Sequence, residues 1–398
     1  MRVLVSAYAC EPGKGSEPGA GWSWALASAR DHDVTVLTRA NNRGPIEAAA
    51  VEGPLPRFVY LDLPASARLW KRGQRGVRLY YLLWQVLAAR EARRLHRERP
   101  FDLVHHLTFA NVWLPALVCL VDAPFVLGPV GGGPRVPLRL YPVLGVRGAL
   151  RELAVVAARV LSAANPLVRL GWRRAAVILL QNEETRDVLP RRHRARATVS
   201  PNASAPAHLG RPPLPGTGSV AAYAGRLLPW KGVALAIEAL ALAPAWSLLV
   251  IGRGPDEERL RRIARRRGVE ERVAFVPWVP RERLWEELAA CRALVVPSLR
   301  EDASLVAAEA HALGLPVVAL DRAGPRALAR IAGRGFELVP VKGRRRCAAE
   351  LAAALARARR APAPAGDSPL GPERVAAVLD RAYRAALLDG ADPLEAAA

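Results

Sequence analysis

The stretch from Pro297 to Gly324 constrains the fold of this 398-residue chain more than any other. It follows a short apolar run, Ala293 to Val296, and contains a second one, Pro316 to Leu320. Runs of this kind are typical of buried parallel strands. Between them, Leu305 to Leu313 has the length and alanine content of a crossover helix, which Gly314 ends. The stretch therefore predicts a strand–loop–helix–strand unit of a doubly wound α/β fold.

Two carboxylates lie in this unit, Glu301 in the loop and Glu309 on the helix. Ligands of such folds bind outside the carboxyl ends of the strands, where helix N-termini present free N–H groups to anions. Both carboxylates could face one crevice there and accept hydrogen bonds from ligand hydroxyls. They could equally be solvated charges near a helix end, because the start of a helix favours acidic residues.

The chain is strongly basic, with a formal net charge of +22 at pH 7. Such a charge attracts phosphates, either of nucleic acid or of anionic lipid headgroups. Only four of the 58 basic residues are lysines and the arginines are spread along the chain, so genome base composition explains the same usage. The four cysteines form no CxxC pair, which argues against a disulfide framework or a zinc site and indicates a reducing cytoplasm. No apolar run reaches about eighteen residues, so we expect a protein that is soluble or rests on a membrane.

The chain opens in the order strand, glycine-rich loop, helix and strand, over Arg2–Ala7, Cys10–Gly21, Trp22–Arg30 and Asp33–Thr38. This order is typical of a Rossmann-type start. Gly19 and Gly21 in the loop would let backbone approach a ligand closely. The glycine spacing does not match the dinucleotide fingerprint, and Arg39 follows the second strand where an acidic residue is needed. A hydride-transferring enzyme is therefore disfavoured.

A basic helix with several aromatic residues is predicted from Arg68 to Arg99. It could lie against a membrane surface, or it could cover a sheet face with its arginines in solvent. The tripeptide Asp31-His32-Asp33 resembles a metal-binding DxD, but it precedes a strand, so we interpret it as a turn.

His105 and His106 follow a predicted strand, Phe101 to Val104, and so fall at its carboxyl end. A histidine pair there could contact a ligand or act in acid–base catalysis, and a structural role stays open. Further on, the loop Gly128 to Pro134, with Gly131 and Gly132, carries little side chain. It predicts close approach of backbone to a substrate.

The second half of the chain repeats the strand–loop–helix pattern from Val220 onward. Arg226 and Lys231 fall at the end of a strand and the start of a helix, where two cations and helix N–H groups could hold a diphosphate. The Pro- and Gly-rich stretch Ser204 to Gly218 predicts an interdomain linker.

The expected architecture is two doubly wound α/β domains that face each other across a cleft lined by strand ends. The expected divisions are a first domain at 1–205, a linker at 206–218, a second domain at 219–372, a last helix at 373–390 and a tail at 391–398.

Several motifs now carry a resemblance. Gly-Arg-Leu-Leu-Pro-Trp-Lys-Gly at 225–232 resembles the GRLxxxKG segment of GT-B glycosyltransferases. Glu301 and Glu309 resemble the E-x7-E pair of glycosyltransferase family 4, which continues here as Glu-Ala-His-Ala-Leu-Gly-Leu-Pro-Val-Val-Ala. The segments 9–22 and 128–133 resemble a subset of that family that acts in exopolysaccharide or other surface-glycan assembly. The similarity covers nearly the whole chain and is strongest in its second half.

The resemblance implies a GT-B fold and a retaining transfer of a sugar from a UDP- or GDP-sugar to a glycan or lipid-linked acceptor, with no metal and no cofactor. Arg226 and Lys231 would hold the diphosphate and stabilise the departing nucleotide. Glu309 would bind the ribose hydroxyls, and Glu301 would bind the donor sugar. The remaining donor contacts implied are Gly225, Gly252, Trp278, Val279, Ser304 and Leu305.

In the first domain, the resemblance implies that His105 or His106 faces the sugar, that Gly19 and Gly21 approach the phosphates or the acceptor, and that the last helix crosses back to this domain. One departure is Ala303-Ser304-Leu305, which stands where the family often has an aromatic-Gly or Gly-Gly pair.

Two alternatives remain at this stage. One is a nucleotide-sugar epimerase or a phosphorylase on the same fold. The other is a non-catalytic, arginine-rich protein that binds nucleic acid or membrane. We expect a cytoplasmic enzyme, peripheral on the inner face of the membrane if it docks there, and no nucleic-acid partner.

Overall fold

The computed structural model describes residues 1–64, 76–209, 218–360 and 368–388. The chain divides into two compact units, one built from 1–133, 159–202 and the residues from 372 onward, the other from 134–158 and 203–371. Residues 68–75 of the predicted basic helix, most of the predicted linker and the predicted tail at 391–398 lie outside the described residues.

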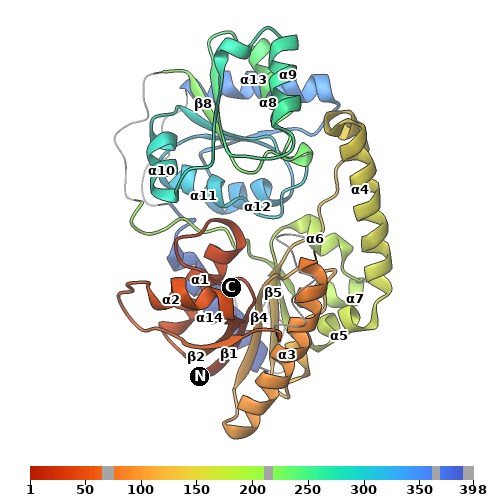
Figure 1. The fold of residues 1–398 in the computed structure, drawn as a ribbon, viewed down its shortest axis with the longest axis vertical. Helices are drawn as coiled ribbons and strands as arrows, with labels where there is room; N and C mark the ends of the chain where they lie inside the picture. Colours follow the sequence, from red (N-terminus) through yellow and green to blue (C-terminus); the bar gives the residue numbers. More distant parts are fainter. Residues whose placement is uncertain (65–75, 210–217, 361–367, 389–398) are drawn as a thin grey trace. The chain divides into compact units, whose positions relative to one another are not determined.

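The first unit is built on a parallel sheet of seven strands in the order β3-β2-β1-β4-β5-β6-β7 (Figure 1). Every described pairing between these strands is parallel, and most of their residues are buried, because helices cover both faces. The strands are β1 (Arg2–Ala7), β2 (Asp33–Arg39), β3 (Arg57–Leu61), β4 (Leu103–Thr108), β5 (Phe125–Val130), β6 (Ala175–Leu180) and β7 (Ala197–Val199).

Two apolar cores flank this sheet. One includes Trp84 and Tyr81, on the same side as α3 and α5; the other includes Trp24 and Tyr383, under α1 and α14. The C-terminal helix α14 therefore packs on the first sheet, as expected. The helices are α1 (Ser16–Ala29), α2 (Arg43–Glu47), α3 (Val77–Glu98), α5 (Pro166–Arg174), α6 (Glu183–Val188), α7 (Arg191–Arg194) and α14 (Pro372–Leu387), with short 3-10 turns η1 (Ala40–Asn42) and η3 (Leu117–Leu120).

The second unit repeats the design with a parallel sheet of six strands in the order β10-β9-β8-β11-β12-β13. Its strands are β8 (Val220–Ala224), β9 (Ser247–Ile251), β10 (Val273–Val276), β11 (Ala293–Val296), β12 (Val317–Leu320) and β13 (Phe336–Val339). Its helices are α8 (Val233–Ala241), α9 (Glu257–Arg266), α10 (Arg281–Ala289), α11 (Leu305–Ala312), α12 (Ala323–Ala332) and α13 (Arg344–Arg360), with 3-10 turns η4 (Leu138–Leu140), η5 (Pro229–Lys231) and η6 (Glu270–Arg272).

The segment 134–158 groups with the second unit, although we expected it in the first domain. It holds η4 and most of helix α4 (Tyr141–Ala164). Leu140, Val143 and Leu144 are buried in the core that also contains α8 and α13 residues. Arg259 of α9 donates a hydrogen bond of 3.0 Å to the Val143 carbonyl. Sequence spacing could not reveal this grouping, because it depends on a core shared by segments about a hundred residues apart.

Two predicted boundaries are wrong. Helix α1 begins at Ser16, so Gly19 and Gly21 lie in a helix and not in a loop. A Cβ on Gly21 would lie 2.2 Å from the Ala9 carbonyl oxygen, so this glycine lets the helix pack closely on the preceding turn. Strand β4 continues to Thr108, so His105 and His106 lie inside it. Helices α4 and α5 are separate, because Asn165 caps α5 and Pro166 begins it.

Candidate active site

The order of strands in the second sheet singles out one position. The chain runs outward from β8 through β9 to β10, and then returns to β11 on the other side of β8 before it continues to β12 and β13. Ligands of doubly wound folds bind at this reversal, outside the carboxyl ends of the two strands concerned. The loop after β8 carries Arg226 and Lys231, and the loop after β11 carries Glu301.

The first of these loops is shaped by glycines in left-handed conformations. Gly225 and Gly252, at the ends of β8 and β9, have φ of 151° and 144°. A Cβ on Gly252 would lie 2.0 Å from the Gly225 carbonyl oxygen, so the two backbones touch. Beside them Arg226 is exposed, and its carbonyl accepts a hydrogen bond of 3.0 Å from the Tyr223 hydroxyl. An exposed arginine therefore lies at the carboxyl end of β8.

The two loops meet through Lys231 and Glu301. The Nζ of Lys231 lies 2.6 Å from Oε2 of Glu301, with one fifth or less of each side chain exposed. The backbone holds them there: Leu299 N–H donates to the Trp230 carbonyl at 2.8 Å. Gly232 has φ of 69°, and a Cβ on it would lie 2.0 Å from the Pro297 carbonyl oxygen. This glycine is required for the two loops to approach.

Glu309 lies on α11, and its side chain is 3% exposed. The Nε of Arg281, at the start of α10, donates to its Oε1 at 2.6 Å, and Nη2 lies 2.5 Å from the same oxygen. Burial raises the pKa of Glu309, and the Arg281 charge acts in the opposite direction. The role of Arg281 could not be predicted from the sequence, because nothing in its local pattern separates it from Arg283 of the same helix.

The remaining predicted donor contacts surround this edge of the sheet. Ser304 is buried at the N-cap of α11 without a side-chain capping bond, and Leu305 is half-buried. Trp278, after β10, is 70% exposed, and Val279 is half-buried. Opposite Ala303, Gly324 of α12 comes so close that a Cβ would lie 2.7 Å from the Ala303 Cα. Gly324 thus lets α12 pack against the backbone of the Glu301 loop.

A second cluster braces the Glu301 loop. Glu152 of α4 is 2% exposed and lies 2.9 Å from Nη1 of Arg300. It also accepts a hydrogen bond of 3.2 Å from the Val136 N–H. Arg300 and Arg151 each place the guanidinium carbon 4.9 Å from the centre of the Trp230 ring. Trp230 and Arg300 directly precede Lys231 and Glu301, so α4 fixes the backbone beside both.

His105 and His106 are buried within the first unit and carry structural hydrogen bonds. His105 bonds through Nε2 to the Gly128 carbonyl at 2.7 Å and through Nδ1 to the Tyr383 hydroxyl at 2.9 Å. His106 Nε2 lies 3.2 Å from the Tyr81 hydroxyl. Burial lowers the pKa of His105 to about 4 and that of His106 to about 3, so both are neutral near pH 7. We therefore leave them out of the proposed site.

The glycine loop after β5 is packed and not open. A Cβ on Gly132 would lie 2.5 Å from the Asn111 side-chain oxygen, and the Gly132 carbonyl accepts a hydrogen bond of 2.6 Å from the Trp113 indole. Gly131 pairs with Asn111 as an isolated parallel bridge. Both glycines are buried. They allow this loop to pack against the turn after β4, a use that sequence alone did not separate from substrate approach.

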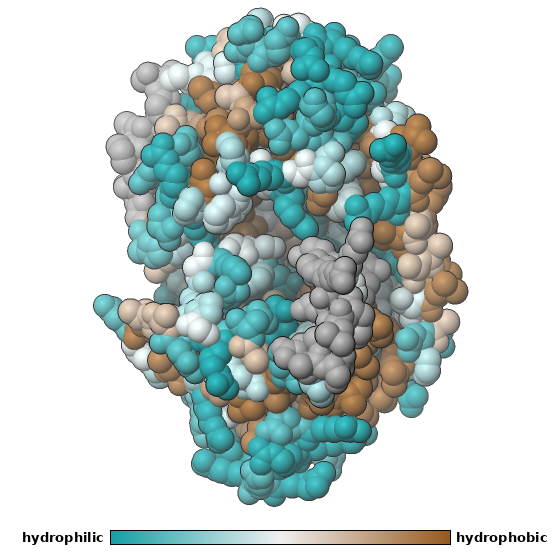
Figure 2. All heavy atoms as spheres, viewed as in Figure 1, coloured by the Kyte–Doolittle hydropathy of each residue, from teal (hydrophilic) through white to brown (hydrophobic). Residues whose placement is uncertain are grey.

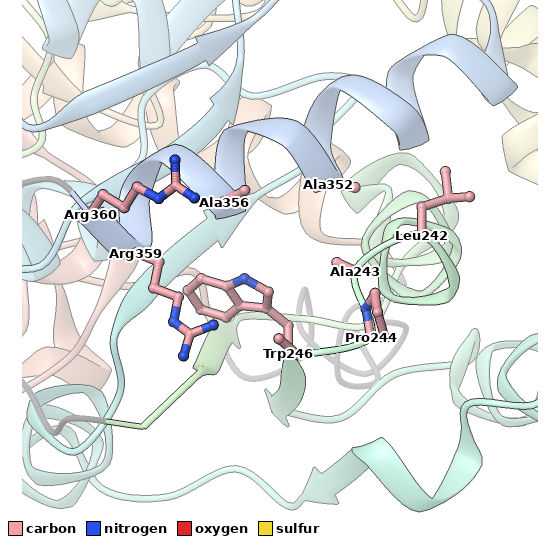
Figure 3. A pocket seen from close by; sticks show the side chains of 9 residues that line it. Leu242, Ala243, Pro244, Trp246, Ala352, Ala356, Arg359 and Arg360 are labelled. Atoms are coloured by element: carbon pink, nitrogen blue, oxygen red, sulfur yellow. The ribbon is translucent and has the colours of Figure 1, made fainter.

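A surface hollow lies at the amino ends of the strands of the second sheet, beside the start of β9 (Figure 3). This is the opposite end of the sheet from the residues described above. The hollow is lined by Trp246, by Leu242 after α8, and by Arg359 and Arg360 at the end of α13. It contains none of the residues described above. Among the described residues, no three His, Cys, Asp or Glu side chains gather as metal ligands would.

The second unit matches a known protein family. Residues 206–358 match the family model described as "Glycosyl transferases group 1". The D-inositol 3-phosphate glycosyltransferase of Acidothermus cellulolyticus is 34% identical over 179 residues, 41% of this chain and 39% of the relative. That of Mycolicibacterium smegmatis is 37% identical over 112 residues, 27% of this chain and 26% of the relative. The matches thus span about two fifths or less of these relatives.

Solved structures match nearly the whole fold. Sucrose-phosphate synthase from Thermosynechococcus elongatus superposes with a TM-score of 0.61 at 18% identity, over 96% of this chain and 98% of that one. Anabaena Alr3699/HepE in complex with UDP and glucose superposes with a TM-score of 0.57 at 17% identity, over 96% and 99%. At these identities the likeness concerns the fold. Residues 206–358 thus match the group 1 glycosyl transferases, and the two Rossmann-like sheets have the GT-B fold of these solved structures.

Proposed function

We propose that this protein transfers a sugar from a nucleoside diphosphate sugar to a glycan or lipid-linked acceptor, with retention and without a metal ion. The observation that carries the proposal is the Lys231–Glu301 pair at the strand reversal, beside the exposed Arg226. Two cations there offer a diphosphate the charge that a divalent ion supplies in other folds. The relatives' names support glycosyl transfer, and UDP in the Alr3699/HepE structure supports a nucleotide-linked donor.

Lys231 and Glu301 are proposed to contact different parts of the donor. An ammonium group has three N–H donors, so Lys231 can keep Glu301 and still bind a phosphate oxygen. Glu301 then has lone pairs left for a hydroxyl of the donor sugar. Because the salt bridge holds both side chains in place before the ligand arrives, little ordering entropy remains to be lost on binding.

Glu309 is proposed to accept the ribose hydroxyls while Arg281 stays on its Oε1. A carboxylate has about four acceptor sites, so one arginine does not exhaust it. The Arg281 charge opposes the rise in the pKa of Glu309 that burial causes, and an ionised carboxylate is the better acceptor for two hydroxyls. The Trp278–Val279 turn is proposed to border the base.

The alternatives lack support of this kind. The family match and the named relatives are glycosyltransferases, which favours neither an epimerase, a phosphorylase nor a nucleic-acid-binding protein. The four cysteines are all buried and unpaired, which supports a reducing compartment and therefore the cytoplasm.

A donor screen tests the proposal. The protein would be incubated with UDP- and GDP-sugars in the presence of EDTA, and slow hydrolysis to UDP or GDP would be measured. One donor should be hydrolysed, and Lys231→Ala should abolish that signal, while Arg262→Ala, an exposed arginine on α9, should keep it. Hydrolysis that needs added metal, or that survives in Lys231→Ala, would overturn the proposal.

A further inference from the structure

Helix α4 carries an exposed apolar stripe. Its exposed fractions are 79% for Val146, 63% for Leu150, 52% for Leu153, 61% for Val160 and 75% for Leu161. The spacing of four, three and seven residues keeps Val146, Leu150, Leu153 and Val160 on one helical face, and Ala154 and Ala157, also exposed, fill the interval. From 146 to 161 such a face is roughly 23 Å long. Figure 2 shows hydrophobic residues along the right edge, where Figure 1 places α4.

Monomeric soluble proteins rarely leave a continuous stripe of this size in water, so it calls for an occupant. No single helix of the described residues has the length and composition to cross a membrane; the bent pair Leu138–Ala164 and Pro166–Arg174, with 66° between its parts, has them only jointly. The stripe is therefore interpreted as a binding surface and not as a membrane-spanning segment.

The exposed charges of the segment that carries the stripe have one sign. Between residues 134 and 174 the only acidic residue is Glu152, which is buried against Arg300. The exposed charges of this segment are all arginines: Arg135, Arg139, Arg147, Arg151, Arg169, Arg173 and Arg174. An apolar helix face whose own segment exposes arginines and no acidic residue is complementary to a bilayer with anionic headgroups. It is a poor match for a second copy of itself, because the like charges would meet.

The other basic helix, α3, is a weaker candidate for such a binding surface. On α3, Leu79, Leu82, Leu83 and Val86 are exposed over two turns, at 52%, 38%, 39% and 40%. Of the arginines that follow on α3, Arg94 is paired with Glu91 and Glu98 on the same helix. The positive charge of α3 is therefore partly neutralised, and its exposed apolar run is shorter than that of α4.

We propose that the outer face of α4 docks this protein on an anionic lipid bilayer. The inner face of the same helix reaches the proposed active site, since Glu152 holds Arg300, and a Cβ on Gly148 would lie 3.1 Å from Pro229. Docking would thus bring the loops of Lys231 and Glu301 to the membrane surface. That the acceptor is lipid-linked rests on the proposed function, whereas docking itself does not.

Vesicle sedimentation without nucleotide tests the docking. Wild-type protein should sediment with phosphatidylcholine vesicles that contain phosphatidylglycerol and far less with phosphatidylcholine alone. Leu150→Ser/Leu153→Ser should lower the partition coefficient by roughly tenfold or more, because two leucines no longer enter the apolar layer. The matched control on α3, Leu79→Ser/Leu83→Ser, should keep it within about twofold, as expected for apolar groups that stay in water.

A second measurement avoids dependence on folding of that variant. All four native cysteines are buried, so Ala157→Cys would be labelled selectively with a polarity-sensitive dye. Its emission should shift to the blue on anionic vesicles. No shift, equal binding to neutral vesicles, loss of binding in the α3 variant, or a wild-type dimer that Leu150→Ser/Leu153→Ser dissociates would each overturn the proposal. Nucleotide binding that fails while vesicle binding persists would count against the proposed function alone.

Discussion

Arg281 and Glu309 form a buried ion pair in which Nε and Nη2 of the arginine lie 2.6 and 2.5 Å from one carboxylate oxygen. The glutamate is 3% exposed and the arginine 16%. Removing a charge of this kind from water is costly unless its partner is in place. The proposed ribose-binding carboxylate is therefore oriented, and its ionised form favoured, by a residue from a different helix.

Arg281→Gln should destabilise the protein by about 3 kcal/mol at pH 7, because it leaves the buried carboxylate unpaired. Burial already raises the pKa of Glu309, and the variant loses the charge that opposed this. A carboxyl whose folded pKa exceeds its unfolded value binds its proton more tightly in the folded state, so the protein gains stability as the pH falls through that range. The deficit of the variant should shrink in acid. Urea unfolding at several pH values measures it.

The control for this variant is Arg283→Gln on the same helix, whose pairs with Glu286 and Glu287 lie at the surface. It should leave the free energy of unfolding almost unchanged, because exposed ion pairs contribute little. A deficit in Arg281→Gln that is equally small, or that grows in acid, would show that Glu309 does not depend on Arg281.

Gly232→Ala tests the contact between the two loops. A Cβ there would lie 2.0 Å from the Pro297 oxygen, so the Lys231 and Glu301 loops should move apart and nucleotide binding should be lost. Gly268→Ala is the matched control, because Gly268 has a similar φ, 63° against 69°, with nothing within 4 Å of its Cβ. Both variants carry the left-handed backbone cost of about 1 kcal/mol. Calorimetric titration with UDP and GDP should separate them, and equal binding by both variants would contradict the assignment.

Much of the second unit could be predicted from the sequence. Short apolar runs such as Ala293–Val296, which became β11, identify buried strands, and Gly and Pro mark where they end. Strand β13 and helix α12 were not anticipated. In the first unit, the prediction of a loop at Gly19 and Gly21 was wrong. Glycine also lets a helix pack closely, as Gly21 does against Ala9.

The site could be predicted only where residues are close in sequence or carry a motif. The motif gave Lys231 and Glu301, which the structure joins. It could not give Arg281 or Glu152, because their partners lie 28 and 148 residues away and are set by the packing of α10 and α4. The histidines misled for the same reason: burial of His105 depends on Tyr383, near the other end of the chain.

Tyr383→Phe should destabilise the protein by about 1 kcal/mol, because it removes hydrogen bonds to His105 and Ser28 in a buried place. It should leave the affinity for UDP or GDP unchanged, as expected of a structural contact. Thermal unfolding and calorimetric titration give the two numbers. A loss of nucleotide affinity with no loss of stability would return His105 and Tyr383 to the active site.

Burial of the histidines also predicts a pH dependence. Their folded pKa values, about 4 for His105 and about 3 for His106, lie below the ordinary value of 6.5. The unfolded chain therefore binds protons first, and stability present above pH 6.5 should be lost as the pH falls from there toward 4. His105→Gln should lose less over this interval than wild type does. Melting temperatures measured across it would reveal parallel curves if the histidine were exposed.

Glu152→Gln should weaken the support of the Glu301 loop. The variant keeps the shape of the side chain but removes the charge that holds Arg300, so the loss of stability should be about 1–3 kcal/mol. The affinity for the donor nucleotide should fall as well, because the backbone beside Lys231 loses its brace. Unfolding and titration on one preparation measure both, and a change in neither would mean that α4 does not position the loop.

The most direct test of the central claim is the shift in melting temperature with UDP and with GDP, in EDTA, for wild type, Arg226→Ala, Lys231→Ala and Arg262→Ala. One nucleotide at about a hundred times its Kd should stabilise wild type and Arg262→Ala by about 2.7 kcal/mol, a rise of a few degrees. The shift should be lost in Arg226→Ala and Lys231→Ala. Flat curves for wild type with both nucleotides, or an undiminished shift in Lys231→Ala, would contradict the account.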